Sequence, residues 1–101
     1  MTRSTANVAT EHASRYLQQL AKHWSHRFEV AFDPTEARID FGEGANVHLA
    51  AAADVLTVSI EKDGTRDIET LETVVADHLK RFAFREELQF DWTRSTGDAP
   101  N

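Results

Sequence analysis

The two histidines of the segment His23-Trp-Ser-His26 are three residues apart. Side chains at this separation share one face of a helix, and two neutral imidazoles on one face can bind the same transition-metal ion. A zinc or iron site needs a third ligand, and His12 cannot supply it, because eleven residues of helix place it about 16 Å from His23. His23 and His26 are therefore a candidate metal site. The simpler interpretation is that both are surface groups interacting with the carboxyl end of a helix.

A further histidine, His78, falls on the apolar side of a second helical segment. A polar ring in this position needs a hydrogen-bond partner or must line a cavity. Three charged residues follow the segment: Arg85, Glu86 and Glu87. Carboxylates can act in acid–base catalysis, so one interpretation pairs His78 with Glu86 as general acid and base. The other makes the charged residues a solvated helix end with surface ion pairs.

The composition excludes several classes of protein. The chain has 101 residues, a net charge of −6 and no cysteine, which excludes thiolate chemistry and disulfide frameworks. The sequence also lacks a glycine-rich phosphate loop. Its apolar runs are far shorter than the roughly 20 residues that span a bilayer. The first residues lack the apolar stretch of a signal peptide, so we expect a cytoplasmic protein without a membrane partner.

Charge is unevenly distributed along the chain. Residues 1–30 carry four basic and two acidic side chains, whereas residues 31–101 carry seven basic and fifteen acidic ones. The small basic excess of the first segment is too weak to neutralise a phosphate backbone. The aromatic residues of the predicted strands alternate in phase with the aliphatic ones, which places them in the core and not on a base-stacking surface. We therefore expect no nucleic-acid partner.

Two helices are expected to position the candidate residues. Thr10 is a potential N-cap with Glu11 in the first turn, and apolar residues then recur at helical spacing from Ala13 to Trp24. A second helix is predicted from about residue 67 to residue 84. Its predicted buried face consists of Ile68, Leu71, Val74, Val75, His78, Leu79 and Phe82.

Six segments alternate between apolar and polar residues with the period of a strand: 4–9, 28–32, 37–41, 47–51, 56–61 and 88–93. Short connections between the middle four favour an antiparallel meander. Each strand has one apolar face, so both helices should cover the same side of the sheet. The prediction is an α+β two-layer sandwich in the order β-α-β-β-β-β-α-β, with one domain at residues 4–94 and a tail at 95–101.

Three stretches carry a resemblance to a known family: residues 13–28 (ASRYLQQLAKHWSHRF), residues 75–92 (VADHLKRFAFREELQFDW) and Arg38-Ile-Asp-Phe-Gly42. Together they resemble the bacterial domain-of-unknown-function family 2218, over residues 4–94. The resemblance implies a small cytoplasmic domain of the kind also found fused to flavin-dependent siderophore-interacting proteins, which reduce ferric siderophores to release iron. The residues that would carry an iron-linked role are His23, His26, His78, Arg85, Glu86 and Glu87.

The leading functional expectation is a non-enzymatic accessory domain linked to iron or siderophore metabolism. It would bind an iron- or siderophore-handling protein, a small ligand or a metal ion through the histidine-bearing end of the first helix. One alternative is a small acid–base enzyme that uses His78 and a carboxylate such as Glu86. The other is an interaction module that forms a homodimer without a ligand. No particular cofactor is indicated.

Overall fold

The computed structural model describes residues 2–42, 44–63 and 67–96. Within them the chain forms six strands and two helices in the predicted order. The elements are β1 (Thr2–Ala9), α1 (Ala13–Trp24), β2 (Glu29–Phe32), β3 (Glu36–Gly42), β4 (Ala45–Ala51), β5 (Val55–Lys62), α2 (Ile68–Phe82) and β6 (Thr93–Thr96). The predicted α+β class is therefore confirmed.

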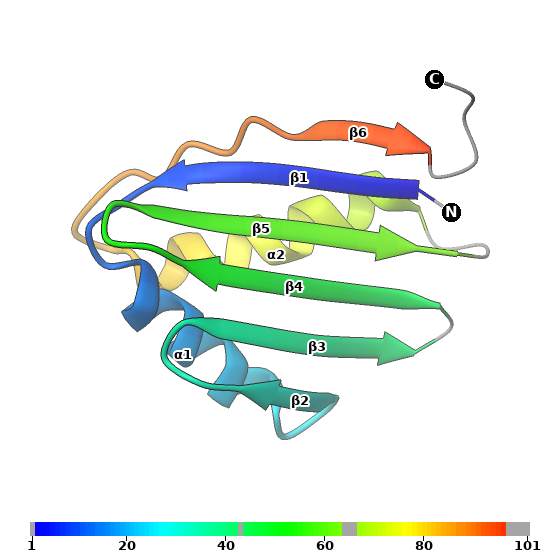
Figure 1. Cartoon of the computed structure of the whole chain (residues 1–101), viewed down its shortest axis with the longest axis horizontal. Helices are drawn as coiled ribbons and strands as arrows, with labels where there is room; N and C mark the ends of the chain where they lie inside the picture. The colour runs from blue at the N-terminus through cyan, green and yellow to red at the C-terminus, as the bar shows by residue number, and fades with distance from the viewer. Residues whose placement is uncertain (1, 43, 64–66, 97–101) are drawn as a thin grey trace.

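The strands form one antiparallel sheet in the order β2-β3-β4-β5-β1-β6 (Figure 1). Strands β2 to β5 are the predicted meander. Strand β1 lies between β5 and β6, and it pairs with β5 along its whole length, from Thr2 opposite Lys62 to Ala9 opposite Val55. The first element of the chain is thus an interior strand of the sheet, and its end leads directly into α1.

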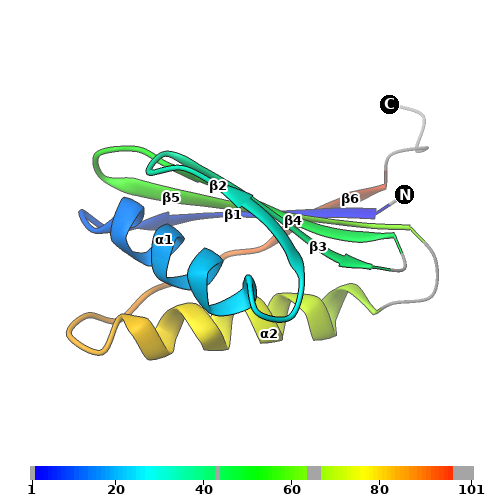
Figure 2. The same ribbon diagram turned by 90° about the horizontal axis from the view of Figure 1, so that it is seen from below.

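Both helices cover the same face of the sheet, as predicted (Figure 2). Alternation along β3 shows the cause, since Ala37, Ile39 and Phe41 are buried whereas Arg38 and Asp40 are exposed. Each aliphatic side chain that is fully removed from water contributes about 1.5 to 3 kcal/mol to folding. The largest fully buried apolar side chains are Leu17, Leu20, Ile39, Leu49, Leu56, Ile60, Leu79, Val8, Val47, Val58 and Val75.

The start of α1 differs from the prediction. The N-cap residue is His12 and not Thr10, so Glu11 precedes the helix instead of lying in its first turn. Thr10 directly follows β1, and its backbone N–H donates to the Asp54 carbonyl at 3.1 Å, which keeps this residue beside the start of β5 and outside the helix. Its hydroxyl nevertheless accepts a hydrogen bond from the His12 N–H at 3.1 Å, which turns the chain from the strand into the helix.

Helix α2 begins at Ile68, one residue after the predicted start, and ends at Phe82, two residues before the predicted end. Its buried face is also rotated from the predicted one, because Val74 is 37% exposed while Ala76 is buried. Neither described helix has the length and hydropathy needed to span a bilayer.

The predicted last strand is present, but its predicted bounds, residues 88–93, are wrong. Strand β6 is Thr93–Thr96 and pairs with the first half of β1. The alternating Leu88, Phe90 and Trp92 lie in an extended segment without strand pairing and pack one side against the core. Apolar alternation is required of any extended segment with one buried side, whether or not its backbone joins a ladder. Residues 95 and 96 of the predicted tail belong to β6, and residues 97–101 lie outside the described part of the chain.

Candidate functional site

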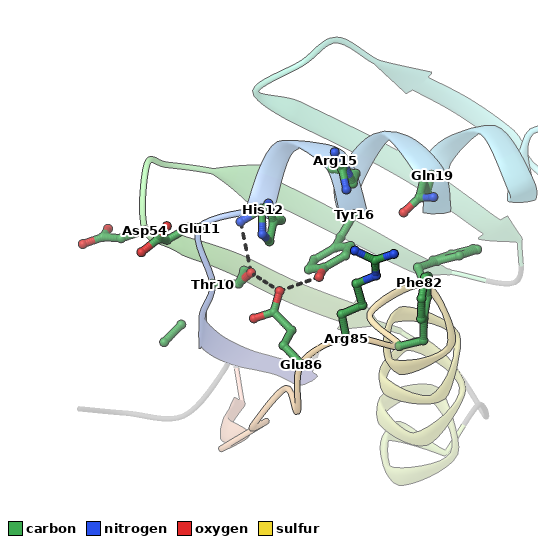
Figure 3. A pocket seen from close by; sticks show the side chains of 12 residues that line it. Thr10, Glu11, His12, Arg15, Tyr16, Gln19, Asp54, Phe82, Arg85 and Glu86 are labelled. Carbon is green, nitrogen blue, oxygen red and sulfur yellow. Dashed lines mark hydrogen bonds between the residues drawn. The ribbon is translucent and has the colours of Figure 1, made fainter.

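A cleft of about 830 Å³ lies between the start of α1 and the segment that follows α2 (Figure 3). The two helices run in opposite directions under the sheet, so the first turns of α1 lie beside the end of α2 (Figure 2). A backbone hydrogen bond of 3.2 Å from the Glu86 N–H to the Ala83 carbonyl forms a turn after α2. This turn places Arg85 and Glu86 against Tyr16 of α1.

A chain of hydrogen bonds crosses the floor of the cleft (Figure 3). One carboxylate oxygen of Glu86, Oε2, accepts hydrogen bonds from the Tyr16 hydroxyl and from the Thr10 hydroxyl, the latter at 3.0 Å. The Thr10 oxygen in turn accepts from the His12 backbone N–H. The network joins the end of β1, the first turn of α1 and the segment after α2, so the cleft is held by three separate parts of the chain.

The surroundings of Glu86 and Tyr16 shift the pKa values of the two side chains in opposite directions. The hydrogen bond from Tyr16, helped by Thr10 and by the nearby His12, lowers the pKa of Glu86 against the opposing effect of burial. Burial, followed by the hydrogen bond to Glu86, raises the pKa of Tyr16. Near neutral pH, Glu86 is therefore an anion and Tyr16 a neutral hydrogen-bond donor.

Charged side chains line the cleft unevenly. Glu11 and Asp54 lie together at one end, and Arg15 and Arg85 lie toward the other (Figure 3). The Arg85 guanidinium is 5.5 Å from the ring centre of Phe84, an aromatic side chain that is 80% exposed. Guanidinium groups bind carboxylates and similar planar anions in a two-pronged arrangement. The cationic end is therefore suited to an anionic ligand with an apolar or aromatic part.

The histidines are divided between two places. The rings of His23 and His78 lie next to each other across the seam between α1 and α2, with their centres 5.5 Å apart and their planes tilted by 46°. The ring centres of Trp24 and His78 are 4.9 Å apart, and those of Phe82 and His23 are 6.0 Å apart. His26 lies beyond the end of α1, where it is exposed. The structure thus brings His78 to His23, whereas sequence spacing had paired His23 with His26.

The predicted metal site at His23 and His26 needs a third ligand. Among residues 2–42, 44–63 and 67–96, no three side chains of His, Cys, Asp or Glu form a group that could hold a metal ion. The two residues of the predicted acid–base pair, His78 and Glu86, have no hydrogen-bond partner in common within the described part of the chain. Glu86 hydrogen-bonds to Tyr16 and Thr10, whereas His78 hydrogen-bonds to the Val74 carbonyl.

Of the predicted charged residues, Arg85 and Glu86 line the cleft, and Glu87 is exposed outside it. Two residues of the network are not among the predicted site residues: Tyr16, which falls in the apolar stripe between Ala13 and Trp24, and Thr10, which is predicted only as an N-cap. One signal was present: Tyr16 is the only residue of that stripe with a hydroxyl, and a buried tyrosine hydroxyl needs a hydrogen-bond partner. The identity of that partner, 70 residues away, has no local signature.

Comparisons with known proteins show a family for this chain and a solved structure with a similar fold. The family described as uncharacterised protein conserved in bacteria (DUF2218) matches residues 5–93. The NMR structure of PA4090 from Pseudomonas aeruginosa is similar to this chain, with 42% identity and a TM-score of 0.74. That similarity covers 92% of this chain and 96% of the other. No curated protein matches the sequence.

Proposed function

The chain belongs to DUF2218, a family of uncharacterised proteins conserved in bacteria, and from this premise we propose that it is a non-enzymatic binding domain for an anionic chelate of iron. The ligand site is the cleft between α1 and the segment after α2, and the ligand class is a ferric siderophore of carboxylate or catecholate type. The observation that carries the proposal is the joint presence of Arg15, Arg85 and the exposed Phe84 around one preformed cleft.

The pKa shifts in the cleft favour binding over catalysis. An efficient general acid or base has a pKa near the working pH. Here the pKa of Glu86 is lowered and that of Tyr16 is raised, so both move away from neutrality. The pair therefore keeps one charge pattern across the physiological range. A fixed pattern of donors and charges is what a site needs in order to select and orient a ligand.

The chemistry of the cleft fits the proposed ligand class. Siderophore complexes with carboxylate or catecholate donors carry negative charge, which Arg15 and Arg85 can neutralise at the cationic end of the cleft. The Phe84 ring supplies an exposed face for an aromatic group. A volume of about 830 Å³ lies in the range of pockets that enclose small molecules. The link to iron itself comes from the resemblance to domains fused to siderophore-interacting proteins.

The test uses gallium(III) complexes, because gallium resembles ferric iron in charge and size but does not broaden NMR signals. Titration with a gallium tris-catecholate and with gallium citrate should shift the backbone signals of Thr10, Arg15, Tyr16 and Arg85. The double variant Arg15→Gln/Arg85→Gln should weaken binding about tenfold or more. Arg38→Gln is the matched control, because Arg38 lies on the open face of the sheet, which the helices do not cover. Unshifted cleft signals, or equal weakening by the control, would overturn the proposal.

The other two predicted functions remain predictions with their own tests. An acid–base enzyme using His78 and Glu86 requires both side chains to reach one substrate atom, and their observed contacts lie in different places. A homodimer would double the mass measured by light scattering at micromolar concentration. An iron- or siderophore-handling protein partner would be detected by adding that protein with and without the gallium chelate.

A further inference from the structure

The seam between α1 and α2 holds a pair of imidazoles that the proposed ligand cleft does not use. His23 lies in the last turn of α1, and His78 lies on the facing side of α2. We infer that His23 and His78 together form an exchangeable site for a divalent transition-metal ion such as Cu²⁺, Ni²⁺ or Zn²⁺. This inference does not rest on the proposed function, since it involves a different place and a bare metal ion.

The hydrogen bond of His78 prepares its ring for coordination. Its Nδ1 lies 2.8 Å from the Val74 carbonyl oxygen. A carbonyl only accepts hydrogen bonds, so Nδ1 carries the proton and Nε2 keeps its lone pair. Histidines that bind metals commonly donate their other ring N–H to a carbonyl or a carboxylate, which fixes the tautomer and the ring orientation. The structure shows this arrangement at His78 before any metal is bound.

The spacing of the two rings is compatible with a shared ion. A metal–nitrogen bond of about 2.1 Å places the ion about 3.2 Å from each ring centre, so rings 5.5 Å apart subtend about 120° at the ion. This angle is near the one that tetrahedral zinc prefers.

The surroundings of the pair determine what kind of site it is. The aromatic rings of Trp24 and Phe82 lie beside the pair, with the Trp24 ring centre 4.9 Å from that of His78 and the Phe82 ring centre 6.0 Å from that of His23. His23 is exposed and His78 half-buried, so an ion can enter from solvent. Because the described residues supply no third ligand, the remaining positions are filled by water. Such a site binds weakly enough to exchange its ion, and its affinity should be greatest for Cu²⁺.

The test compares metal ions and histidine variants on the intact chain. Side-chain nitrogen NMR should show His78 protonated on Nδ1 without metal, and Zn²⁺ should shift the signals of His23 and His78. Cu²⁺ should bind more tightly than Zn²⁺, with two nitrogen ligands in its EPR spectrum. His23→Gln should weaken Cu²⁺ binding about tenfold or more, and since His23 is exposed this variant should remain folded.

His26→Gln is the matched control, because His26 is also exposed and lies three residues from His23. It should leave Cu²⁺ affinity unchanged. Equal weakening by His26→Gln, or a His78 ring protonated on Nε2, would overturn the inference. Failure of the gallium chelates to bind would not bear on the His23 and His78 site. The variant Arg15→Gln/Arg85→Gln should retain full Cu²⁺ affinity, so each proposal can be overturned without the other.

Discussion

The Tyr16 hydroxyl donates a hydrogen bond to the Glu86 carboxylate, joining residues that are 70 positions apart in the chain. Tyr16 belongs to the first turn of α1, and its ring is buried against the core. Glu86 belongs to the turn after α2 and is half-buried. The bond therefore fixes the floor of the cleft and also ties α1 to the segment that follows α2.

The variant Tyr16→Phe removes this bond while keeping the buried ring. We expect it to lower the free energy of unfolding by about 1 kcal/mol, as measured by urea denaturation. The pKa of Glu86 should rise toward its ordinary value, as followed by carboxyl carbon NMR. Thr10→Val removes the other hydroxyl donor to Glu86 and should raise that pKa less, because the Tyr16 hydrogen bond has the larger effect. An unchanged Glu86 pKa in Tyr16→Phe would contradict the assignment of this bond.

The parts of the fold that sequence could predict are those with a local periodic signal. Helix α1 shows this well, because its apolar stripe from Ala13 to Trp24 is the face that the sheet buries. The bounds of β6 could not be predicted from such a periodic pattern. Leu88, Phe90 and Trp92 alternate as strongly as any strand, but the alternation reports a buried side and not a hydrogen-bonded partner.

The candidate site was only partly predictable for a related reason. Glu86 and Arg85 stood out as charged residues after a helix, and both line the cleft. The partner of Glu86 is set by the antiparallel packing of α1 and α2, which brings Tyr16 to it across most of the chain. His23 likewise contacts His78 on the other helix. The packing of α1 against α2 decides this contact, and the separation of the two histidines in the sequence gives no sign of it.

The buried carboxylate Glu72 should make the protein sensitive to acid. It accepts hydrogen bonds from Ser4 at 2.5 Å and from two nitrogens of Arg94 at 2.7 and 2.9 Å, which ties α2 to β1 and β6. The hydrogen bonds from Arg94 lower the pKa of Glu72 below its ordinary value of 4.5. A carboxylate with a lowered folded pKa stabilises the fold above the unfolded pKa, and this contribution is lost as the pH falls through the folded value.

We therefore expect Glu72→Gln to reduce the free energy of unfolding at pH 7 by about 2 kcal/mol. The variant should also lose part of the decrease in stability that the unmodified chain shows on acidification, as followed by urea denaturation at several pH values. Glu61→Gln is the matched control, because Glu61 pairs with Arg3 at the surface. Its effect should be below about 1 kcal/mol. Equal effects of the two variants would contradict the structural importance of Glu72.

The exposed ring of Phe84 should matter for binding and not for folding. Phe84 is 80% exposed, so Phe84→Ser should change the unfolding free energy by less than about 0.5 kcal/mol. The same variant should weaken binding of the gallium tris-catecholate more than that of gallium citrate, because only the catecholate offers an aromatic face. Calorimetric titration of both complexes measures the difference. Equal weakening for both ligands would show that Phe84 does not contact an aromatic group.

Two glycines near the turn between β3 and β4 have the same backbone conformation but different surroundings. Gly42 has a φ of 82° and Gly44 a φ of 79°, a backbone conformation that residues other than glycine rarely adopt. A Cβ atom on Gly42 would meet no atom within 4 Å. A Cβ atom on Gly44 would collide with the backbone carbonyl oxygen of Asp63, the residue directly after β5.

Gly42→Ala should therefore cost about 1 kcal/mol, the strain of the backbone conformation alone. Gly44→Ala should cost more than about 3 kcal/mol, because the backbone must also move apart where the Asp63 N–H donates to the Gly44 carbonyl at 2.9 Å. Urea denaturation of the two variants measures the difference, and hydrogen exchange of the Asp63 amide should be faster in Gly44→Ala alone. A loss of stability in Gly44→Ala no larger than in Gly42→Ala would show that the ends of β4 and β5 are not held together as the structure indicates.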